Sequence, residues 1–295
     1  MALKINDITY VYDEGTAMAV NALDHITTEI PEGQFIGLVG HTGSGKSTFV
    51  QMLNGLLKPT SGTIEWDGQD IHGDNFNRKL LRANVGLVFQ YPEHQLFETD
   101  VITDVMFGPK NLGLSEEEGR KRAEDALTAV GLGKETWTMS PFDISGGQKR
   151  RCAIAGVLAM HPKILILDEP TAGLDPKGRD EILDMVRNMK ENHNMTILLV
   201  SHSMEDVAEY ADRILVMDAG KIVMDGSPKE VFARYKELES IGLSAPQMLY
   251  IMQYLKKRGL DVSEDVLTVQ DGVSEILKGL SKRKNVESEG KEQNV

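Results

Sequence analysis

The chain has 295 residues, which is enough for one large domain or two small ones. Apolar residues make up 41% and charged residues 26%, and 32 Lys and Arg against 45 Asp and Glu give a formal net charge of -13. This acidity argues against non-specific nucleic-acid binding and against adhesion to anionic lipid, because both need clustered positive charge.

Targeting and redox signals are sparse. No apolar run approaches the roughly 20 residues of a membrane-spanning helix, and residues 1–10 lack the apolar core of a signal peptide. The only cysteine, Cys152, cannot form an internal disulfide, so we expect a buried thiol in a reducing compartment. If this protein serves a membrane, it does so from the cytoplasmic side through a partner.

Five short apolar runs, rich in β-branched residues, predict buried strands. They cover residues 34–39, 85–89, 164–167, 196–200 and 214–217. Such runs, alternating with helical segments, are typical of a parallel sheet covered on both faces. Two weaker runs predict antiparallel strands: residues 62–67, followed by Gly68, and residues 220–224, followed by Asp225 and Gly226.

Residues 92–160 predict helices and no strand. Ser115 followed by Glu118 fits a capping box, with a helix running to Val130 and ending near Gly131. We therefore expect one domain over residues 1–230, with a core of 1–91 and 161–230 and an inserted helical subdomain of 92–160.

Beyond residue 230 the composition changes twice. Residues 231–281 predict a helical C-terminal region with an apolar stripe of Met248, Leu249, Met252 and Leu255. This stripe either adds a dimer interface or packs on the chain's own core. Residues 282–295 carry little that could be buried, and we expect them to be disordered.

The strongest local signal is a glycine-rich loop between a predicted strand and a predicted helix at 47–57. Its residues, with the threonine that follows, are Gly40, His41, Thr42, Gly43, Ser44, Gly45, Lys46, Ser47 and Thr48. Glycines let backbone N–H groups surround phosphate oxygens, and the helix N-terminus adds partial positive charge. Lys46 can reach the β- and γ-phosphates of a nucleotide, and the Ser47 hydroxyl can bind Mg²⁺.

Two carboxylates follow the predicted strand at 164–167. Asp168 and Glu169 therefore lie at the carboxyl edge of the sheet, where ligands bind in open α/β folds. Asp168 can hold the Mg²⁺ shell, and Glu169 can polarise an attacking water. Alone, this pattern is equally typical of a solvated acidic turn; the phosphate loop favours the catalytic interpretation.

A second anion site follows from Ser145, Gly146, Gly147 and Gln148. Ser145 can cap a helix that runs toward Met160, and the two glycines leave backbone N–H groups open. One γ-phosphate needs one phosphate loop, so a second site of the same kind needs an explanation. The alternative is an ordinary helix start.

These motifs in this order resemble the ABC ATPase family, over about residues 5–227. The resemblance implies a P-loop NTPase (RecA-like) α/β core with an antiparallel β subdomain, an inserted helical subdomain and a small helical C-terminal region. In that family the Ser-Gly-Gly-Gln sequence binds the γ-phosphate of an ATP held by the other subunit of a dimer, so Ser145–Gln148 would serve the partner's nucleotide.

The same resemblance implies roles for four further residues. Gln90 would join the metal and water shell, His202 would contact the γ-phosphate and the attacking water, and Asp175 of the D-loop would reach across the dimer. Tyr12 would stack on adenine. Each has a plain structural explanation alone, but the order of all the motifs disfavours that explanation for the set.

A narrower resemblance points to the ATPases of energy-coupling factor transporters, which import vitamins and metal ions. It is carried by residues 89–97, 107–111 and 168–176, and the chain is similar to the second of the two paralogous ATPases. In that family an acidic groove after Gln90 receives arginine-bearing helices of the transmembrane T component, and Glu93 is the matching acid.

The resemblance implies the cofactors and partners. These are ATP and Mg²⁺, a second, non-identical ATPase, a T component and a substrate-binding membrane S component, at the cytoplasmic face of the membrane and without nucleic acid. The C-terminal region would help to hold the two ATPases together. The sequence itself leaves open the transported substrate and whether the dimer is homo- or heteromeric.

Two other classes remain as alternatives. One is a soluble ABC ATPase that acts in a nucleic-acid or ribosome-linked process. Such proteins generally carry two ATPase domains in one chain or long coiled coils, and the sequence predicts neither. An unrelated P-loop kinase would leave Ser145–Gln148 and His202 unexplained.

Overall fold

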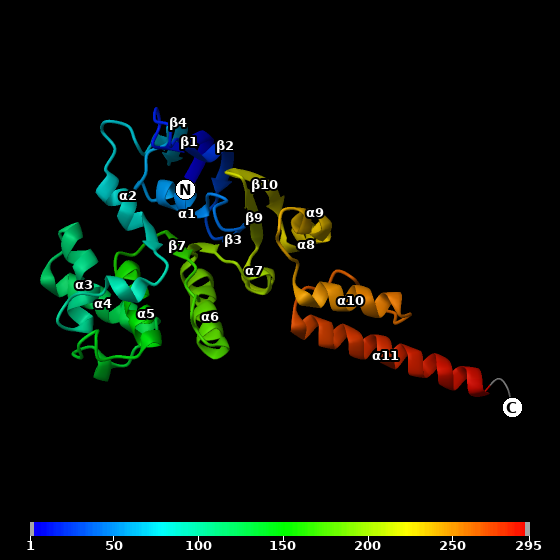
Figure 1. Cartoon of the computed structure of the whole chain (residues 1–295). Coiled ribbons are helices and arrows are strands. Elements are labelled where there is room, and N and C mark those ends of the chain that lie inside the picture. Colours follow the sequence, from blue (N-terminus) through cyan, green and yellow to red (C-terminus); the bar gives the residue numbers. More distant parts are fainter. Residues whose placement is uncertain (1–2, 293–295) are drawn as a thin grey trace.

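The computed structural model describes residues 3–292, and two β-sheets form its core (Figure 1). The strands of the larger sheet are β3 (Phe35–Val39), β6 (Val85–Val88), β7 (Ile164–Asp168), β8 (Thr196–Val200), β9 (Arg213–Asp218) and β10 (Lys221–Gly226). The strands of the smaller sheet are β1 (Leu3–Tyr12), β2 (Val20–Ile30), β4 (Ser61–Trp66) and β5 (Gln69–Asp70). Their orders are β10-β9-β3-β8-β7-β6 and β2-β1-β4-β5.

The five predicted buried strands are all present in the larger sheet and run parallel to one another. β10 joins antiparallel to β9, as predicted. Asp225 and Gly226, which were expected to form a turn, belong to β10 instead. Ala219 and Gly220 make the turn between β9 and β10, with φ of 46° and 79°.

Alternate residues of the parallel strands pack into two separate cores, as the two-residue period of a strand requires. Leu38, Ile166 and Leu198 face the smaller sheet and helix α1 (Lys46–Leu53). On the opposite face, Leu167 and Leu199 pack with α6 (Pro176–His193) and with the helical subdomain. The central sheet is therefore covered on both sides.

The inserted helical subdomain is confirmed, and it lies beside the core on the side of β6 and β7 (Figure 1). Its elements, with α2 before them, are α2 (Arg78–Asn84), η1 (Pro92–Gln95), α3 (Val101–Leu112), α4 (Glu116–Ala129), η2 (Lys134–Thr136) and α5 (Gly146–Leu158). Ser115 caps α4, because its hydroxyl accepts from the backbone N–H of Glu118. Only this half of the predicted capping box is present, since the Glu118 carboxylate accepts from Arg122. Cys152 is buried in α5, and burial raises the pKa of its thiol to about 12.

The C-terminal region is helical, and α10 and α11 lie side by side, pointing away from the core (Figure 1). The helices from the last parallel strands onward are α7 (Met204–Tyr210), α8 (Pro228–Ala233), α9 (Tyr235–Ser240), α10 (Gln247–Lys257) and α11 (Val269–Glu292). Leu249 packs on the core around α7 and β9, while Met248 and Met252 pack toward Ile276 of α11. The apolar stripe of α10 thus packs within its own chain.

The expected disorder of residues 282–295 is not what the structure shows for residues 282–292, since α11 continues to Glu292. The physical reason is that Lys, Glu and Arg, which are frequent in this stretch, are good helix formers. Residues 293–295 lie outside the described residues.

Within residues 3–292, no helix is both long and apolar enough to cross a membrane.

Candidate functional site

The phosphate loop connects β3 to α1 at the carboxyl edge of the parallel sheet. Gly45 adopts φ of 100°, and a Cβ there would lie 2.5 Å from the carbonyl oxygen of Ala22. Only glycine fits this position. The Ser44 hydroxyl is buried without a hydrogen-bond partner among the described residues, which fits a loop that receives phosphate oxygens.

Lys46 already points into this loop. Its Nζ donates to the carbonyl oxygens of Gly40 and His41 at 2.8 and 2.9 Å, and the residue is 6% exposed. Burial lowers the pKa of Lys46, and the carboxylates of Glu169 and Asp168 oppose that effect. The loop therefore holds a buried cation where an anionic phosphate would be bound.

His41 ties the loop to the end of β9. Its Nε2 lies 2.8 Å from Asp218 Oδ1, and its Nδ1 lies 2.7 Å from the carbonyl oxygen of Thr42. The hydrogen bond to Thr42 and the carboxylate of Asp218 raise the pKa of His41. Asp218 was not predicted, because it is 177 residues away in sequence and ends a strand, β9, that carries no other site signal.

The three residues predicted as catalytic converge on one carboxylate. Gln90 Nε2 donates to Glu169 Oε2 at 2.6 Å, and His202 Nε2 lies 2.5 Å from Glu169 Oε1. Glu169 follows β7 directly and has φ of 49°, in the left-handed region. Its backbone N–H donates to Val200 at the end of β8, which fixes this conformation beside His202.

The metal-binding residues suggested by the sequence also meet here. Asp168 accepts a hydrogen bond from Ser47, and burial raises the pKa of Asp168 while that hydrogen bond opposes the rise. Hydroxyl, carboxylate and amide oxygens from Ser47, Asp168 and Gln90 are the donor types that Mg²⁺ prefers, so the residues fit this ion. Among the described side chains no group of three or more His, Cys, Asp or Glu could hold a metal. Phosphate oxygens would have to complete the shell.

Tyr12 lies where an adenine platform beside the loop is expected. Its hydroxyl is 3.1 Å from Thr48 Oγ1 in α1, and its ring meets Tyr10 edge-on with centroids 4.8 Å apart. The residue is 39% exposed. One face of the site thus carries an accessible aromatic ring held at a fixed position.

The predicted second anion site forms the N-terminus of α5. Ser145 and Gln148 make a full capping box, with the Gln148 N–H donating to Ser145 Oγ and the Ser145 N–H donating to Gln148 Oε1. A Cβ on Gly146 or Gly147 would meet nothing within 4 Å. The segment is therefore open to solvent, on a different subdomain from Lys46.

Asp175 caps α6, since its Oδ1 accepts from the backbone N–H of Gly178 at 2.8 Å. The side chain is thus occupied within its own helix. The exposed position at the start of α6 leaves the D-loop backbone at the surface.

Glu93, the acid expected to meet the T component, is bound within its own chain. Both of its carboxylate oxygens are bound by Arg150 of α5, at 2.7 and 3.1 Å, and the Glu93 side chain is 18% exposed. Burial raises the pKa of Glu93, but the hydrogen bonds and charge of Arg150 outweigh it and hold that pKa below its usual value. Glu93 is therefore not a free acid awaiting a partner's arginine.

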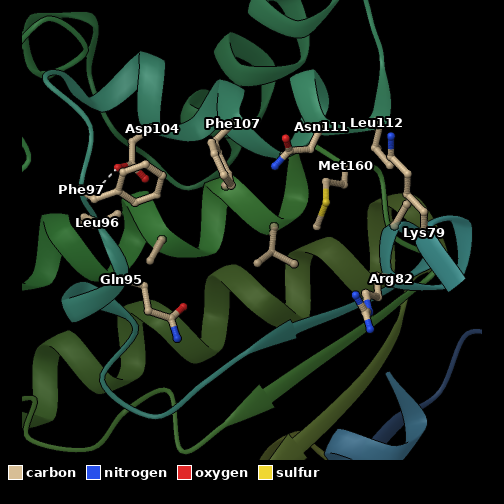
Figure 2. Close-up of a pocket in the computed structure, with 15 residues that line it drawn as sticks. Lys79, Arg82, Gln95, Leu96, Phe97, Asp104, Phe107, Asn111, Leu112 and Met160 are labelled. Carbon is tan, nitrogen blue, oxygen red and sulfur yellow. Dashed lines mark hydrogen bonds between the residues drawn. The ribbon is translucent and has the colours of Figure 1, made fainter. Parts of the chain in front are cut away.

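A groove of about 560 Å³ nevertheless lies next to this segment, between η1, α2, α3 and α5 (Figure 2). Leu96, Phe97 and Phe107 supply apolar surface, and the two phenylalanine rings meet edge-on with centroids 5.0 Å apart. Lys79 and Arg82 lie at one end and Asp104 at the other. The groove is apolar and mixed in charge, not acidic.

Asp104, the acid of this groove, is also engaged. Its Oδ2 accepts from the backbone N–H groups of Phe97 and Glu98 at 2.9 and 3.0 Å. It shapes the loop at the groove edge.

The family model described as ABC transporter matches residues 23–172. The chain is 52% identical to "Energy-coupling factor transporter ATP-binding protein EcfA2" of Caldanaerobacter subterraneus subsp. tengcongensis, over 97% of this chain and 100% of that protein. The protein of the same description from Clostridium tetani is 54% identical, over 94% and 97%.

The chain belongs to the ABC transporter ATP-binding family. A solved structure described as cbiO1 from Clostridium perfringens, part of the ABC transporter complex cbiONQ, matches this ABC ATPase with a TM-score of 0.71 at 41% identity, covering 81% of this chain and 93% of that one. The dimeric ABC cassette MJ0796, bound to ADP and Pi in a post-hydrolysis state, matches with a TM-score of 0.68 at 29% identity, covering 77% and 98%. The ABC ATPase fold and ATP as its ligand are thereby established.

Proposed function

We propose that this chain is an ATP-hydrolysing subunit that powers an energy-coupling factor importer. The observation that carries the proposal is the position of Glu169, held between Gln90 and His202 at the edge of the phosphate loop. The relatives described as energy-coupling factor ATP-binding proteins, each matched over nearly its whole length, support the transporter type.

The chemistry follows from the residues around Glu169. Lys46 and the loop N–H groups bind the β- and γ-phosphates, and Tyr12 stacks on the adenine. Glu169 orients a water and accepts its proton as the water oxygen attacks the γ-phosphorus. The bond from that phosphorus to the β–γ bridging oxygen breaks, and ADP leaves with this oxygen, while His202 and Gln90 hold the Glu169 carboxylate in place. Bound Mg²⁺, held by Ser47, Asp168 and Gln90, would neutralise charge on the phosphates.

Each complete site requires two chains. Ser145–Gln148 lies at the start of α5 on the helical subdomain, so it binds the γ-phosphate held by a second ATPase. Asp175, at the start of α6, lies at the same contact between the two ATPases. The dimeric ABC cassettes of similar fold support this arrangement. The second ATPase is a non-identical paralogue, as the description EcfA2 of the relatives suggests.

The C-terminal region supplies a further dimer contact, through a surface other than the one first expected. Along α11, apolar side chains are exposed at spacings of three and four residues, which places them on one side of the helix. They are Val269, Val273, Leu277 and Leu280, between 44% and 67% exposed. This row, the α11 stripe, has no partner within the described part of the chain.

The groove beside η1 receives the transmembrane T component. Its apolar floor and mixed charges suit an amphipathic helix laid between α3 and α5 (Figure 2). A substrate-binding S component completes the importer, and the ATPase lies at the cytoplasmic face of the membrane. No described helix could anchor it there alone.

Purification from detergent-solubilised membranes tests this function. We expect a tagged chain to bring with it a second ATPase and hydrophobic subunits, and the complex to hydrolyse ATP and drive uptake in proteoliposomes. Recovery of ribosomal or nucleic-acid material in their place would contradict the proposal.

A further inference from the structure

Arg150 is the most deeply buried Lys or Arg among the described residues, with its side chain 3% exposed. It lies in the second turn of α5, the helix that begins with the exposed Gly146–Gly147 segment. A buried guanidinium is costly unless its N–H groups are satisfied. Here they are bound by three partners.

Those partners belong to two other parts of the catalytic site. Nε and Nη2 bind the carboxylate of Glu93, which lies in η1, three residues after Gln90. Nη1 donates to the carbonyl oxygens of Pro170 and Ala172 at 3.0 and 2.7 Å. These two carbonyls belong to the segment between Glu169 and Asp175.

The two segments that Arg150 joins also lie close to each other. A Cβ placed on Gly173 would be 4.0 Å from the Tyr91 ring. Tyr91 and Glu169, the residues at the start of each segment, both have left-handed backbones, with φ of 53° and 49°. Non-glycine residues keep such conformations only where surrounding contacts impose them.

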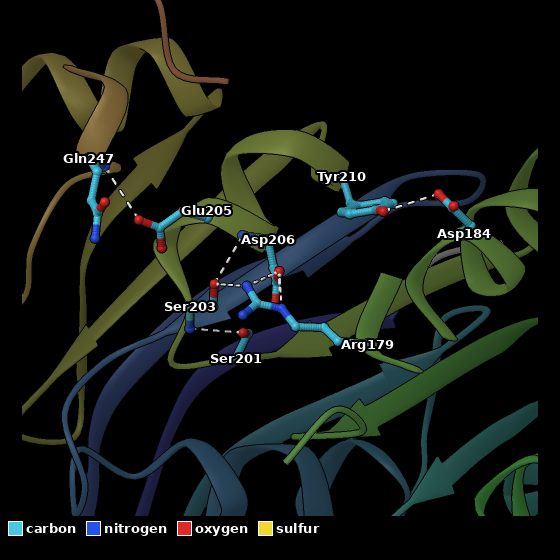
Figure 3. Close-up of polar contacts among 8 residues, drawn as sticks. All are labelled: Arg179, Asp184, Ser201, Ser203, Glu205, Asp206, Tyr210 and Gln247. Atoms are coloured by element: carbon cyan, nitrogen blue, oxygen red, sulfur yellow. Dashed lines mark hydrogen bonds and ion pairs between the residues drawn. The ribbon is translucent and has the colours of Figure 1, made fainter. Parts of the chain in front are cut away.

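The far end of the second segment is held by a different arginine (Figure 3). Arg179, in the first turns of α6 after Asp175, donates to Asp206 and to the Ser203 hydroxyl. Ser203 directly follows His202. The segment 170–175 is therefore bound at one end by Arg150 of the helical subdomain. At its other end it leads to the contacts of Arg179 beside His202.

We propose that Arg150, with Glu93 as its counter-ion, is a positioning residue that makes Gln90 and the segment after Glu169 move together with α5. The inference rests on the proposed function. When the helical subdomain rotates, Arg150 moves with it, and so do the two segments that Arg150 binds, after Gln90 and after Glu169. The Glu169 carboxylate is therefore aligned only when α5 is in place. A misplacement of about 1 Å in such an alignment can cost 100-fold in rate.

The test compares conservative variants in the complete transporter complex. Arg150→Lys keeps the charge but cannot span a carboxylate and two carbonyls, and Glu93→Gln keeps the shape but removes the charge. Arg151→Lys is the matched control, because Arg151 is the neighbouring arginine and bonds only Val130 and Glu181 in the described contacts. Steady-state ATP hydrolysis and ATP affinity are measured for each variant, with thermal unfolding as a check of folding.

We expect Arg150→Lys and Glu93→Gln each to lower kcat by about 10- to 100-fold, with the Kd for ATP within twofold of wild type. The double variant should be no slower than the worse single variant, because the two residues act as one unit. A kcat for folded Arg150→Lys within twofold of that for Arg151→Lys would overturn the proposal, and so would additive losses or an equal loss of ATP affinity. If Arg150→Lys fails to assemble, Glu93→Gln decides by the same criteria. A wild-type complex without ATPase activity would overturn the proposed function itself.

Discussion

At the scale of single residues, the site is organised around one carboxylate that has two polar neighbours. Glu169 receives a hydrogen bond from Gln90 and lies against His202, while Lys46 is held by two loop carbonyls. Hydrolysis and binding are thus assigned to different side chains, which substitution can separate.

Replacing Glu169 with Gln removes the proton acceptor and leaves the phosphate loop unchanged. We expect ATP binding to persist and hydrolysis to slow by about 10²- to 10⁴-fold, the usual contribution of a general base. Single-turnover hydrolysis and equilibrium nucleotide binding measure the two effects. Glu181→Gln, an exposed carboxylate of α6, is the control; near-normal turnover in Glu169→Gln would remove Glu169 from this role.

Lys46→Ala should have the opposite profile. The ammonium is the point charge that meets the β- and γ-phosphates, so its loss should weaken ATP binding severely. Titration with a fluorescent ATP analogue measures the affinity. Lys58→Ala, at a lysine that follows α1 in the chain, is the control. Wild-type affinity in Lys46→Ala would refute the phosphate-loop assignment.

The ion pair of Glu93 with Arg150 predicts a pH-dependent stability. The pKa of Glu93 is lower in the folded than in the unfolded chain, so between these two pKa values only the unfolded chain binds the proton. The stabilisation is complete above the usual glutamate pKa and is lost as pH falls through the folded value. Glu93→Gln should lower the free energy of unfolding by about 2 kcal/mol at pH 7.

Urea unfolding of wild type and Glu93→Gln measures this difference at pH 7 and again below pH 4, in the isolated chain. We expect the difference to shrink in acid. A difference that stays constant with pH would show that the charge of Glu93 does not contribute.

At the scale of elements, α5 serves three purposes along its length. Its first turn carries the capping box of Ser145 and Gln148, its second turn carries Arg150, and Gly156 and Val157 form part of the groove. One helix therefore connects the proposed second anion site, the segments after Gln90 and Glu169, and the groove beside η1.

The groove offers a direct test of partner binding. Phe107→Ser removes one of two paired rings from its wall and should weaken assembly with the T component, while ATP affinity of the isolated chain stays unchanged. Val223→Ser, an exposed apolar residue of β10 far from the groove lining, is the control. Co-purification yields of the T component compare the two variants, and equal yields would show that the groove is not the docking site.

How much the sequence predicted also differs by element. The parallel strands and the phosphate loop were found because continuous apolar runs and fixed spacings are local signals. β1 and β2 were missed because register shifts between Ile5, Ile8 and Tyr10, and the left-handed backbones of Asp7 and His25, interrupt their alternation of buried and exposed residues. The partner of Glu93 is 57 residues away and the partner of His41 is 177, so no local pattern could have identified either.

At the scale of the whole molecule, the α11 stripe predicts a contact between subunits. Leu277→Glu places a charge in that apolar row and should weaken dimerisation without affecting folding or binding of a single nucleotide. Ser274→Glu introduces the same charge on the polar side of α11 as a control. Sedimentation of each variant with the paralogous ATPase decides; a dimer as stable as wild type in Leu277→Glu would exclude the stripe from the interface.

The separation of the phosphate loop on α1 from the capping box on α5 has a genetic consequence in the proposed dimer. A defect at Lys46 and a defect at Ser145 of the same gene damage different active sites, one its own and one its partner's. Natural selection therefore acts on pairs of genes, and the two sites of a heterodimer are free to diverge in sequence. One site can lose hydrolysis and retain only nucleotide binding, while the other site remains catalytic.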